Sequence, residues 1–403
     1  MRESRCASLG CDHDHRIGNL KHGSLHIYCS LPFVFHLNHR PCPSSHPTTP
    51  AHLQPYNSQP MMRDDDDEYV FFADRDEWKD LEPIEQYENI NPLAPILYTK
   101  EYKDATGYFR AIVKKEEKSP RVLELTEAVI RMNPGHYSAW QYRYETLLAI
   151  GAPLDVELKL MDELAVKYLK SYQVWHHRRL LVTLTRKPIP ELAFITRSLA
   201  DDTKNYHTWS YRQWLLAYFN DEEDMWAGEL DFVEQLLGQD IRNNSAWHHR
   251  FFVVWASGVR EGDEDRERVF KRELVYVKQN ISLAPNNASA WNYLRGVLEH
   301  NKVPFARVAD FVKPYTLPYD SSKKDIVDVD NPPPAPSADL PAVPAIEFLA
   351  DVYERVGDKA SVLQAVELWK SLANEHDTIR KKYWEHRVRE AIESVASAEA
   401  RSA

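Results

Sequence analysis

The side chains best suited to chemistry stand in two short stretches, residues 170–173 (Lys-Ser-Tyr-Gln) and 205–207 (Asn-Tyr-His). Lys170, Gln173 and Asn205-Tyr206-His207 are departures from a motif that recurs along the chain. A functional site is used once, whereas packing is used in every copy of a repeat. The positions at which the copies differ are therefore our candidates for a functional site.

Two pairs of adjacent histidines, His176/His177 and His248/His249, resemble metal ligands at first sight. Neighbouring residues on a helix diverge by about 100°, so both members of a pair cannot easily face one ion. We predict instead that one histidine of each pair packs in the interior and the other lies on the surface.

The cysteines are confined to the first 42 residues, and the rest of the chain has none. This distribution predicts an intracellular, cytoplasmic protein, because a disulfide-stapled fold would carry cysteines in its core. The spacing of Cys6, Cys11, His13 and His15 could nominally ligate zinc, but no second half follows and the surrounding sequence is rich in Pro, Ser and His. An unstructured extension over residues 1–60 is the favoured interpretation. We expect translation to start naturally at Met61 or Met62, which would make residues 1–60 a gene-model artefact.

Composition excludes several functions. The chain has 403 residues, 50 basic and 61 acidic, and a net charge of −11, which argues against a general nucleic-acid binder. Neither G-x-G-x-x-G nor G-x-x-x-x-G-K-[ST] occurs, so the usual nucleotide-binding loops are absent from the sequence. No run approaches the roughly 20 apolar residues of a membrane-spanning helix.

The candidate residues belong to a repeat. One pattern, with a tryptophan followed by an arginine three or four residues later, occurs five times, and each copy follows a segment with apolar residues at helical spacing. We predict a helical hairpin of roughly 35 residues per copy, stacked as an all-α, α–α superhelical solenoid in the form of a crescent. The recurring residues are expected to be structural, with the tryptophan filling the space between hairpins and the arginine pairing with the adjacent repeat: Trp140, Trp175, Trp209, Trp247 and Trp291, with Arg143, Arg178, Arg212 and Arg250.

The predicted domain boundaries follow composition. Hairpin repeats are expected over residues 61–316, a proline-rich loop over 317–344, and C-terminal helices that complete the solenoid over 345–403. Within the last part we expect helices at 345–357, 360–374 and 377–396, the last capped by Asp377 or Thr378.

The repeats resemble the protein prenyltransferase α-subunit repeat family. The likeness extends to stretches that do not repeat, such as Lys170-Ser-Tyr-Gln-Val-Trp175, Lys204-Asn-Tyr-His-Thr-Trp209 and the segment from Asp377 to Trp384. These stretches are similar to the branch of the family shared by protein farnesyltransferase and type I geranylgeranyltransferase.

The resemblance implies a crescent wrapped around a β subunit, of farnesyltransferase or of geranylgeranyltransferase I. That partner would carry zinc, and magnesium for the farnesyl enzyme, whereas this chain would hold no cofactor. The pair would transfer a farnesyl or geranylgeranyl group from its isoprenoid diphosphate to the cysteine of a C-a-a-X protein. The resemblance makes Lys170 the catalytic residue that reaches the diphosphate. It also assigns Tyr172, Asn205, Tyr206 and His207 to the diphosphate region, and Gln173 and Tyr137 to the peptide substrate.

Two alternatives stay open. The α subunit of Rab geranylgeranyltransferase has the same repeat, but Gln173 and the C-terminal helix favour the C-a-a-X enzymes. A non-catalytic solenoid that binds peptides is the other alternative. It would have no need for Lys170 beside Asn205-Tyr-His207 in two adjacent repeats.

Overall fold

The computed structural model describes residues 69–87, 90–221, 223–256, 265–319 and 328–402. The predicted extension over residues 1–60, with Cys6, Cys11, His13 and His15, lies outside them. The described residues form helices and no strand. None of these helices combines the length and the apolar character that crossing a bilayer requires.

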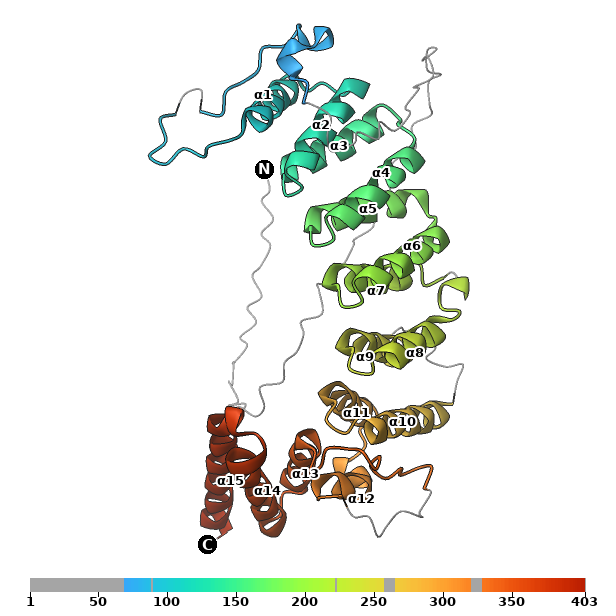
Figure 1. Cartoon of the computed structure of the whole chain (residues 1–403), viewed down its shortest axis with the longest axis vertical. Helices are drawn as coiled ribbons and strands as arrows, with labels where there is room; N and C mark the ends of the chain where they lie inside the picture. The colour runs from blue at the N-terminus through green and yellow to red at the C-terminus, as the bar shows by residue number, and fades with distance from the viewer. Residues whose placement is uncertain (1–68, 88–89, 222, 257–264, 320–327, 403) are drawn as a thin grey trace, which may run out of the picture. The chain divides into compact units, whose positions relative to one another are not determined.

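Five helical hairpins follow a first helix, α1 (Lys100–Lys115). Figure 1 shows the hairpins lying one below another in chain order. The second helix of each contacts the second helix of the next, so the predicted all-α solenoid is confirmed. The hairpins are α2 (Pro120–Met132) with α3 (Tyr137–Ala149), α4 (Leu154–Lys167) with α5 (Tyr172–Thr185), α6 (Pro188–Asp201) with α7 (Tyr206–Tyr218), α8 (Glu229–Gln239) with α9 (Asn244–Phe251), and α10 (Arg266–Leu283) with α11 (Ala288–His300).

Every second helix starts on a side-chain cap, which satisfies backbone N–H groups that have no partner inside the helix. The caps stand four residues before each tryptophan and are His136, Ser171, Asn205, Asn243 and Asn287. The cap of the first repeat is His136, whose Nδ1 accepts from the Ala139 N–H at 3.1 Å.

Each repeat tryptophan is buried and also fastens the turn of its own hairpin. Its indole N–H donates to the carbonyl six residues earlier, at 2.8–2.9 Å in all five repeats. The tryptophans therefore fill the core, as predicted, and fix the turn that presents the cap. The carbonyl acceptors are Pro134, Leu169, Thr203, Ile241 and Pro285.

Each repeat arginine forms a buried ion pair with a glutamate of the next hairpin, which confirms the predicted pairing. The pairs are Arg143–Glu157, Arg178–Glu191, Arg212–Glu229 and Arg250–Glu273. A second side chain contacts each glutamate from the helix that follows it, at 2.7–2.9 Å: His177, Tyr211, His249 and Tyr293. His177 and His249 are buried while His176 and His248 are exposed. The division of each histidine pair is thus confirmed.

The charges of one such cluster are strongly coupled. Burial alone would raise the pKa of Glu157, but the charge of Arg143 and the hydrogen bonds from His177 and Arg143 lower it to about 2. The carboxylate therefore stays ionised inside the core. This ion pair contributes stability above the pKa of an unfolded glutamate and loses it as the pH falls from about 4.5 toward 2.

The C-terminal part consists of α12 (Ala309–Val312), α13 (Val343–Val356), α14 (Lys359–Ser371) and α15 (Lys381–Ser402). Asp377 stands at the N-cap position of the turn that leads into α15, as expected, but its carboxylate makes no cap hydrogen bond and instead accepts from the Trp384 indole at 3.0 Å. Helix α15 continues to Ser402, past the expected end at 396, through a run rich in Ala and Glu that favours helix.

The described part of the proline-rich segment lies against α10. The buried Lys278 donates to the Asp330 carbonyl at 3.1 Å and to the Asn331 side chain at 2.8 Å. Farther along, the Ala335 N–H donates to the Ser282 carbonyl at 3.1 Å. These bonds attach the segment to the fifth hairpin.

Candidate functional site

The predicted site residues stand at one kind of place in the fold, the N-terminal ends of the second helices. Tyr137 opens α3, Tyr172 and Gln173 open α5, and Tyr206 and His207 open α7. Because the caps align these helix starts in consecutive hairpins, side chains from different repeats meet along one edge of the stack.

Three of these residues form an aromatic cluster across two repeats. The Tyr172 ring meets the His207 ring edge to face with centroids 4.3 Å apart, and the Tyr206 ring meets His207 at 5.4 Å. Tyr172 and Tyr206 are well exposed, whereas His207 is half-buried. Burial lowers the pKa of His207, so the imidazole is mainly neutral at pH 7 and presents one donor and one acceptor.

Lys170 lies in the turn just before this cluster. Its side chain is exposed, and within the described residues it makes no hydrogen bond or ion pair. The lysine at the same position of the next repeat, Lys204, forms an ion pair with Asp240 at 2.9 Å. Of these two equivalent lysines, Lys170 is the one whose charge is available to a ligand.

Asn205 differs from the other candidates because it is buried, with 4 % of its surface exposed. Its oxygen accepts from the Thr208 N–H at 3.0 Å, and its amide donates to Asp202 at 3.3 Å. Asn205 thus lies next to the cluster as a helix cap, and both its side-chain oxygen and its side-chain nitrogen have hydrogen-bond partners.

The two residues assigned to the peptide lie apart from the aromatic contacts. Gln173 is partly exposed, and its oxygen accepts from the Ser171 hydroxyl at 3.1 Å, which leaves the amide hydrogens for another acceptor. Tyr137 is exposed at the start of α3. Both therefore remain accessible to a ligand at this edge.

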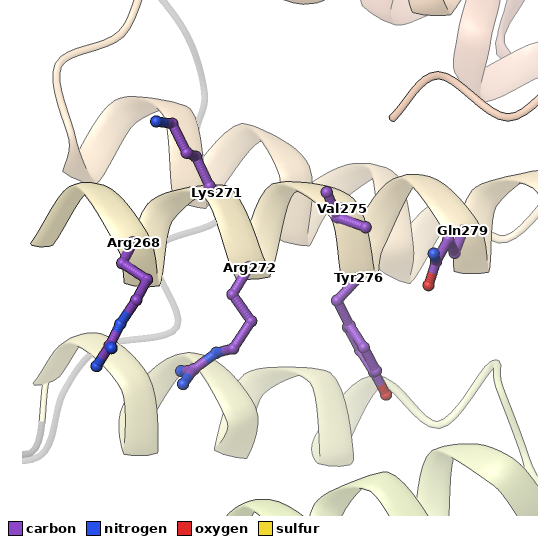
Figure 2. Close-up of a pocket in the computed structure, with 6 residues that line it drawn as sticks. All are labelled: Arg268, Lys271, Arg272, Val275, Tyr276 and Gln279. Atoms are coloured by element: carbon purple, nitrogen blue, oxygen red, sulfur yellow. The ribbon is translucent and has the colours of Figure 1, made fainter. Parts of the chain in front are cut away.

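A shallow groove elsewhere contains none of the predicted residues. It lies on α10 and is lined by Arg268, Lys271, Arg272, Val275, Tyr276 and Gln279. Figure 2 shows that Arg268, Arg272 and Tyr276 project to the same side of the helix. All six residues come from one helix, and the Arg272 guanidinium is bonded to Glu273 of that helix at 3.0 Å. We assign the site to the cluster around Lys170 instead.

No group of three or more His, Cys, Asp or Glu side chains in the described ranges is arranged to hold a metal ion. The donor set around Lys170, a cation with tyrosines and an imidazole, suits an anion better than a metal.

Sequence analysis missed the buried glutamates Glu157, Glu191, Glu229 and Glu273. They lie 14, 13, 17 and 23 residues after their arginine partners, so no constant spacing reveals them. The available signal was an acidic residue in the first turn of the helix, which suits the helix dipole; Glu157, Glu191 and Glu229 show it, whereas Glu273 lies farther along α10.

Comparisons with known proteins agree with the repeat architecture. Five segments match the family described as protein prenyltransferase alpha subunit repeat: residues 119–150, 154–185, 190–219, 226–257 and 270–301. These segments correspond to the five hairpins.

Curated proteins of two names are similar to this chain, over different shares of their own length. The chain is 35% identical over 330 residues to "Protein farnesyltransferase/geranylgeranyltransferase type-1 subunit alpha" of Dictyostelium discoideum, covering 80% of this chain and 94% of that protein. The protein of the same name from Schizosaccharomyces pombe is 38% identical over 325 residues, 79% of this chain and 96% of its own. "Geranylgeranyl transferase type-2 subunit alpha" of Mus musculus is 32% identical over 219 residues, 49% of this chain and 37% of its own.

A solved structure has the same architecture. "Candida albicans protein geranylgeranyltransferase-I complexed with GGPP" contains a chain that superposes with a TM-score of 0.65 at 28% identity. The match covers 81% of this chain and 100% of that one.

Proposed function

The chain belongs to the protein prenyltransferase alpha subunit family, and we propose that it is the α subunit of a heterodimeric C-a-a-X protein prenyltransferase. The enzyme would transfer a farnesyl or geranylgeranyl group from its diphosphate to the cysteine of a C-terminal C-a-a-X motif. Similarity to the shared farnesyltransferase and type-1 α subunits over at least 94% of their length supports this branch. The match to a type-2 subunit covers only 37% of that protein.

The observation that carries the proposal is the available charge of Lys170 beside Tyr172, Tyr206 and His207. As the bond between the isoprenoid carbon and its diphosphate oxygen breaks, negative charge grows on the leaving diphosphate. An ammonium placed there stabilises the transition state more than the ground state, which is the requirement for catalysis. In this proposal the tyrosine hydroxyls and the His207 N–H would donate to the remaining phosphate oxygens.

The partner would supply what this chain does not. We propose that zinc, and magnesium for the farnesyl reaction, belong to the β subunit, and that the heterodimer works in the cytoplasm. Zinc would hold the substrate cysteine as its thiolate, the form that is nucleophilic. In this proposal the α chain alone transfers no prenyl group.

The direct test is reconstitution. The chain is co-expressed with a β subunit of farnesyltransferase, of the type I enzyme or of the type II enzyme, or is expressed alone. Transfer from each isoprenoid diphosphate to a C-a-a-X peptide and to a Rab protein is then measured. We expect transfer to the C-a-a-X peptide with the farnesyltransferase and type I β subunits. Transfer only to Rab with a type II partner would favour the alternative, and assembly without any transfer would favour a scaffold.

Gln173 provides a prediction about the peptide. If its amide donates to the C-terminal carboxylate of the substrate, Gln173→Ala should raise the KM for the peptide by about tenfold, since a hydrogen bond to a charged group is worth roughly 1.5–3 kcal/mol. The kcat should change less, because the contact exists in the ground state. Gln141→Ala on α3, which removes an exposed amide bonded to Glu145, serves as the control. A fall in kcat at unchanged KM contradicts the assignment.

A second prediction concerns assembly and uses the apolar strap, defined as residues 90–97 between the N-terminal turns and α1. Leu93 and Leu97 are 105% and 91% exposed there, and Ile90 and Ile96 are also exposed. The strap is attached at Ile96, whose N–H donates to the Tyr87 hydroxyl at 3.0 Å. Apolar surface presented in this way suits burial against a partner subunit.

Replacing Leu93 and Leu97 together with aspartate should therefore weaken the heterodimer. We expect the Kd for the β subunit to rise by about tenfold to hundredfold, because the variant removes two leucines from the interface and each tenfold change in Kd corresponds to about 1.4 kcal/mol. The control is Val356→Asp, which changes an exposed aliphatic residue outside the strap, on α13. Unchanged affinity in a titration with the β subunit would show that the strap lies outside the interface.

A further inference from the structure

Neighbouring hairpin turns are joined by a repeated hydrogen bond. The carbonyl that accepts the tryptophan indole also accepts a bond from the cap side chain of the next repeat. Asn243 donates in this way to Thr203 at 3.2 Å and Asn287 to Ile241 at 2.7 Å. The single Ser171 hydroxyl hydrogen is shared between the Pro134 carbonyl at 3.3 Å and the Gln173 oxygen at 3.1 Å. Three of the four junctions between repeats therefore have their turns linked.

The junction between the third and fourth repeats carries a second link. Lys204, five residues before its tryptophan, forms an ion pair at 2.9 Å with Asp240, which stands seven residues before the next tryptophan. The pair lowers the pKa of Asp240, with the hydrogen bond from Lys204 as the main cause. At this junction the asparagine binds the turn carbonyl and the aspartate binds the lysine.

The junction between the second and third repeats has the same residue types at the same positions but different bonds. Lys170 corresponds to Lys204, Asp202 to Asp240, and Asn205 to Asn243. Here the Asn205 amide donates to Asp202 at 3.3 Å, and the Leu169 carbonyl receives only the indole bond among the described residues. Lys170 forms no ion pair with Asp202 within the described residues.

We infer that Asn205 is a positioning residue whose amide occupies Asp202 and thereby keeps Lys170 available to the diphosphate. This inference rests on the proposed function, and it gives Asn205 a role that differs from direct diphosphate binding. The alternative arrangement is the one seen at the next junction, in which the aspartate holds the lysine. The two arrangements differ in the acceptor of the asparagine amide hydrogens, which is Asp202 for Asn205 and the Thr203 carbonyl for Asn243.

Charge and burial support this role. Asn205 is buried, and its oxygen already accepts from the Thr208 N–H and hydroxyl at 3.0 and 3.1 Å. Only its amide hydrogens can select between Asp202 and Leu169. Asp202 also accepts from the Lys204 N–H at 3.2 Å, as Asp240 does from Arg242 at 2.9 Å, so its carboxylate is held at the turn in either arrangement.

The test is a suppressor experiment in the purified heterodimer. Asn205→Ser keeps a good helix cap, as Ser171 shows in the preceding repeat, but removes the amide that occupies Asp202. Asp202 should then capture Lys170. Because an exposed ion pair is worth up to about 1 kcal/mol, the single-turnover rate with isoprenoid diphosphate should fall by about twofold to fivefold at low salt. The loss should shrink at 0.5 M salt.

Asp202→Asn supplies the decisive comparison. Alone it should change the rate by less than about twofold, because Lys170 is already free and the asparagine oxygen can still accept from the Lys204 N–H. Combined with Asn205→Ser it should restore the wild-type rate, since no charge remains to capture Lys170. A crystal structure of the Asn205→Ser heterodimer should show the Lys170 ammonium within ion-pair distance of Asp202.

The possible results separate the inference about Asn205 from the proposed function. If Asn205 contacts the diphosphate itself, Asp202→Asn will not rescue Asn205→Ser, and the inference is wrong. If Asn205→Ser leaves the rate unchanged while Lys170→Ala lowers it, the inference fails and the proposed function stands. If Lys170→Ala has no effect on the rate, the proposed role of Lys170 fails first. In the Lys170→Ala background, Asn205→Ser should cause no further loss.

Discussion

Replacing Lys170 with alanine is expected to lower the single-turnover rate of the heterodimer by about 10² to 10³. A cation placed against developing charge in a site that excludes water contributes roughly 2–4 kcal/mol to the transition state, and each 1.36 kcal/mol is a factor of ten. Affinity for the isoprenoid diphosphate should fall less than the rate, because the charge on the leaving group is largest in the transition state. Rapid-quench measurement of the prenylated peptide at saturating substrate gives the rate.

The repeat supplies a matched control for this variant. Lys204 occupies the equivalent position one repeat later and is exposed, but its ammonium is paired with Asp240. Lys204→Ala removes the same charge from the same kind of turn and should cost no more than an exposed ion pair, up to about 1 kcal/mol in stability. Lys170→Arg should recover part of the lost rate, since charge is kept while reach and geometry change. Equal effects of Lys170→Ala and Lys204→Ala on the rate would remove Lys170 from the mechanism.

The repeat pattern was sufficient to predict the hairpins, because packing imposes the same demand in every copy. A large residue must fill each gap between hairpins, and Trp140 and its four equivalents meet that demand at one position. The separation of His176 from His177 was equally predictable, since adjacent helical residues cannot share a face. Local geometry alone determines these features.

The sequence predicted only the arginine of each ion pair. The arginines recur at nearly fixed spacing because they share a helix with the tryptophan. Their partners, such as Glu157 and Glu273, lie on the next hairpin, beyond a loop of variable length. Register across such a loop depends on how the helices pack, which the spacing of residues in one chain does not specify.

The sequence could not predict whether Lys170 forms an ion pair. Lys170 and Lys204 precede their tryptophans by the same interval, and each is followed by an aspartate at the same place in the next repeat. Residue types therefore predict the same ion pair twice, whereas the structure forms it once. The difference lies in the orientation of the Asn205 amide, which only the three-dimensional arrangement reveals.

The second large effect concerns stability and the ion pair between Arg143 and Glu157. Both side chains are almost completely buried, at 4% and 3% exposure, and two hydrogen bonds of 2.7 Å join them. Arg143→Met leaves the Glu157 carboxylate in the core with His177 as its remaining partner. We expect a loss of about 3–5 kcal/mol in the free energy of unfolding, because an unpaired buried charge keeps its desolvation cost. Arg131→Met, which breaks an exposed pair with Glu163, should cost less than about 1 kcal/mol.

Two further measurements separate the lost ion pair from lost packing. The double variant Arg143→Met/Glu157→Leu removes both charges and should regain most of the stability, since an apolar pair of similar volume often replaces a buried ion pair without cost.

In Arg143→Met the pH dependence of the free energy of unfolding should also reverse. In the wild type the pKa of Glu157 is about 2, so stability falls as the pH drops from about 4.5 toward 2. Without Arg143, burial raises that pKa above its unfolded value, and the variant should gain stability as the pH falls from 7 toward 5. Urea unfolding of the heterodimer at one fixed concentration tests both points, because assembly shifts apparent stability. A double variant as unstable as Arg143→Met, with the wild-type pH dependence, would show that Arg143 acts through packing and not through its charge.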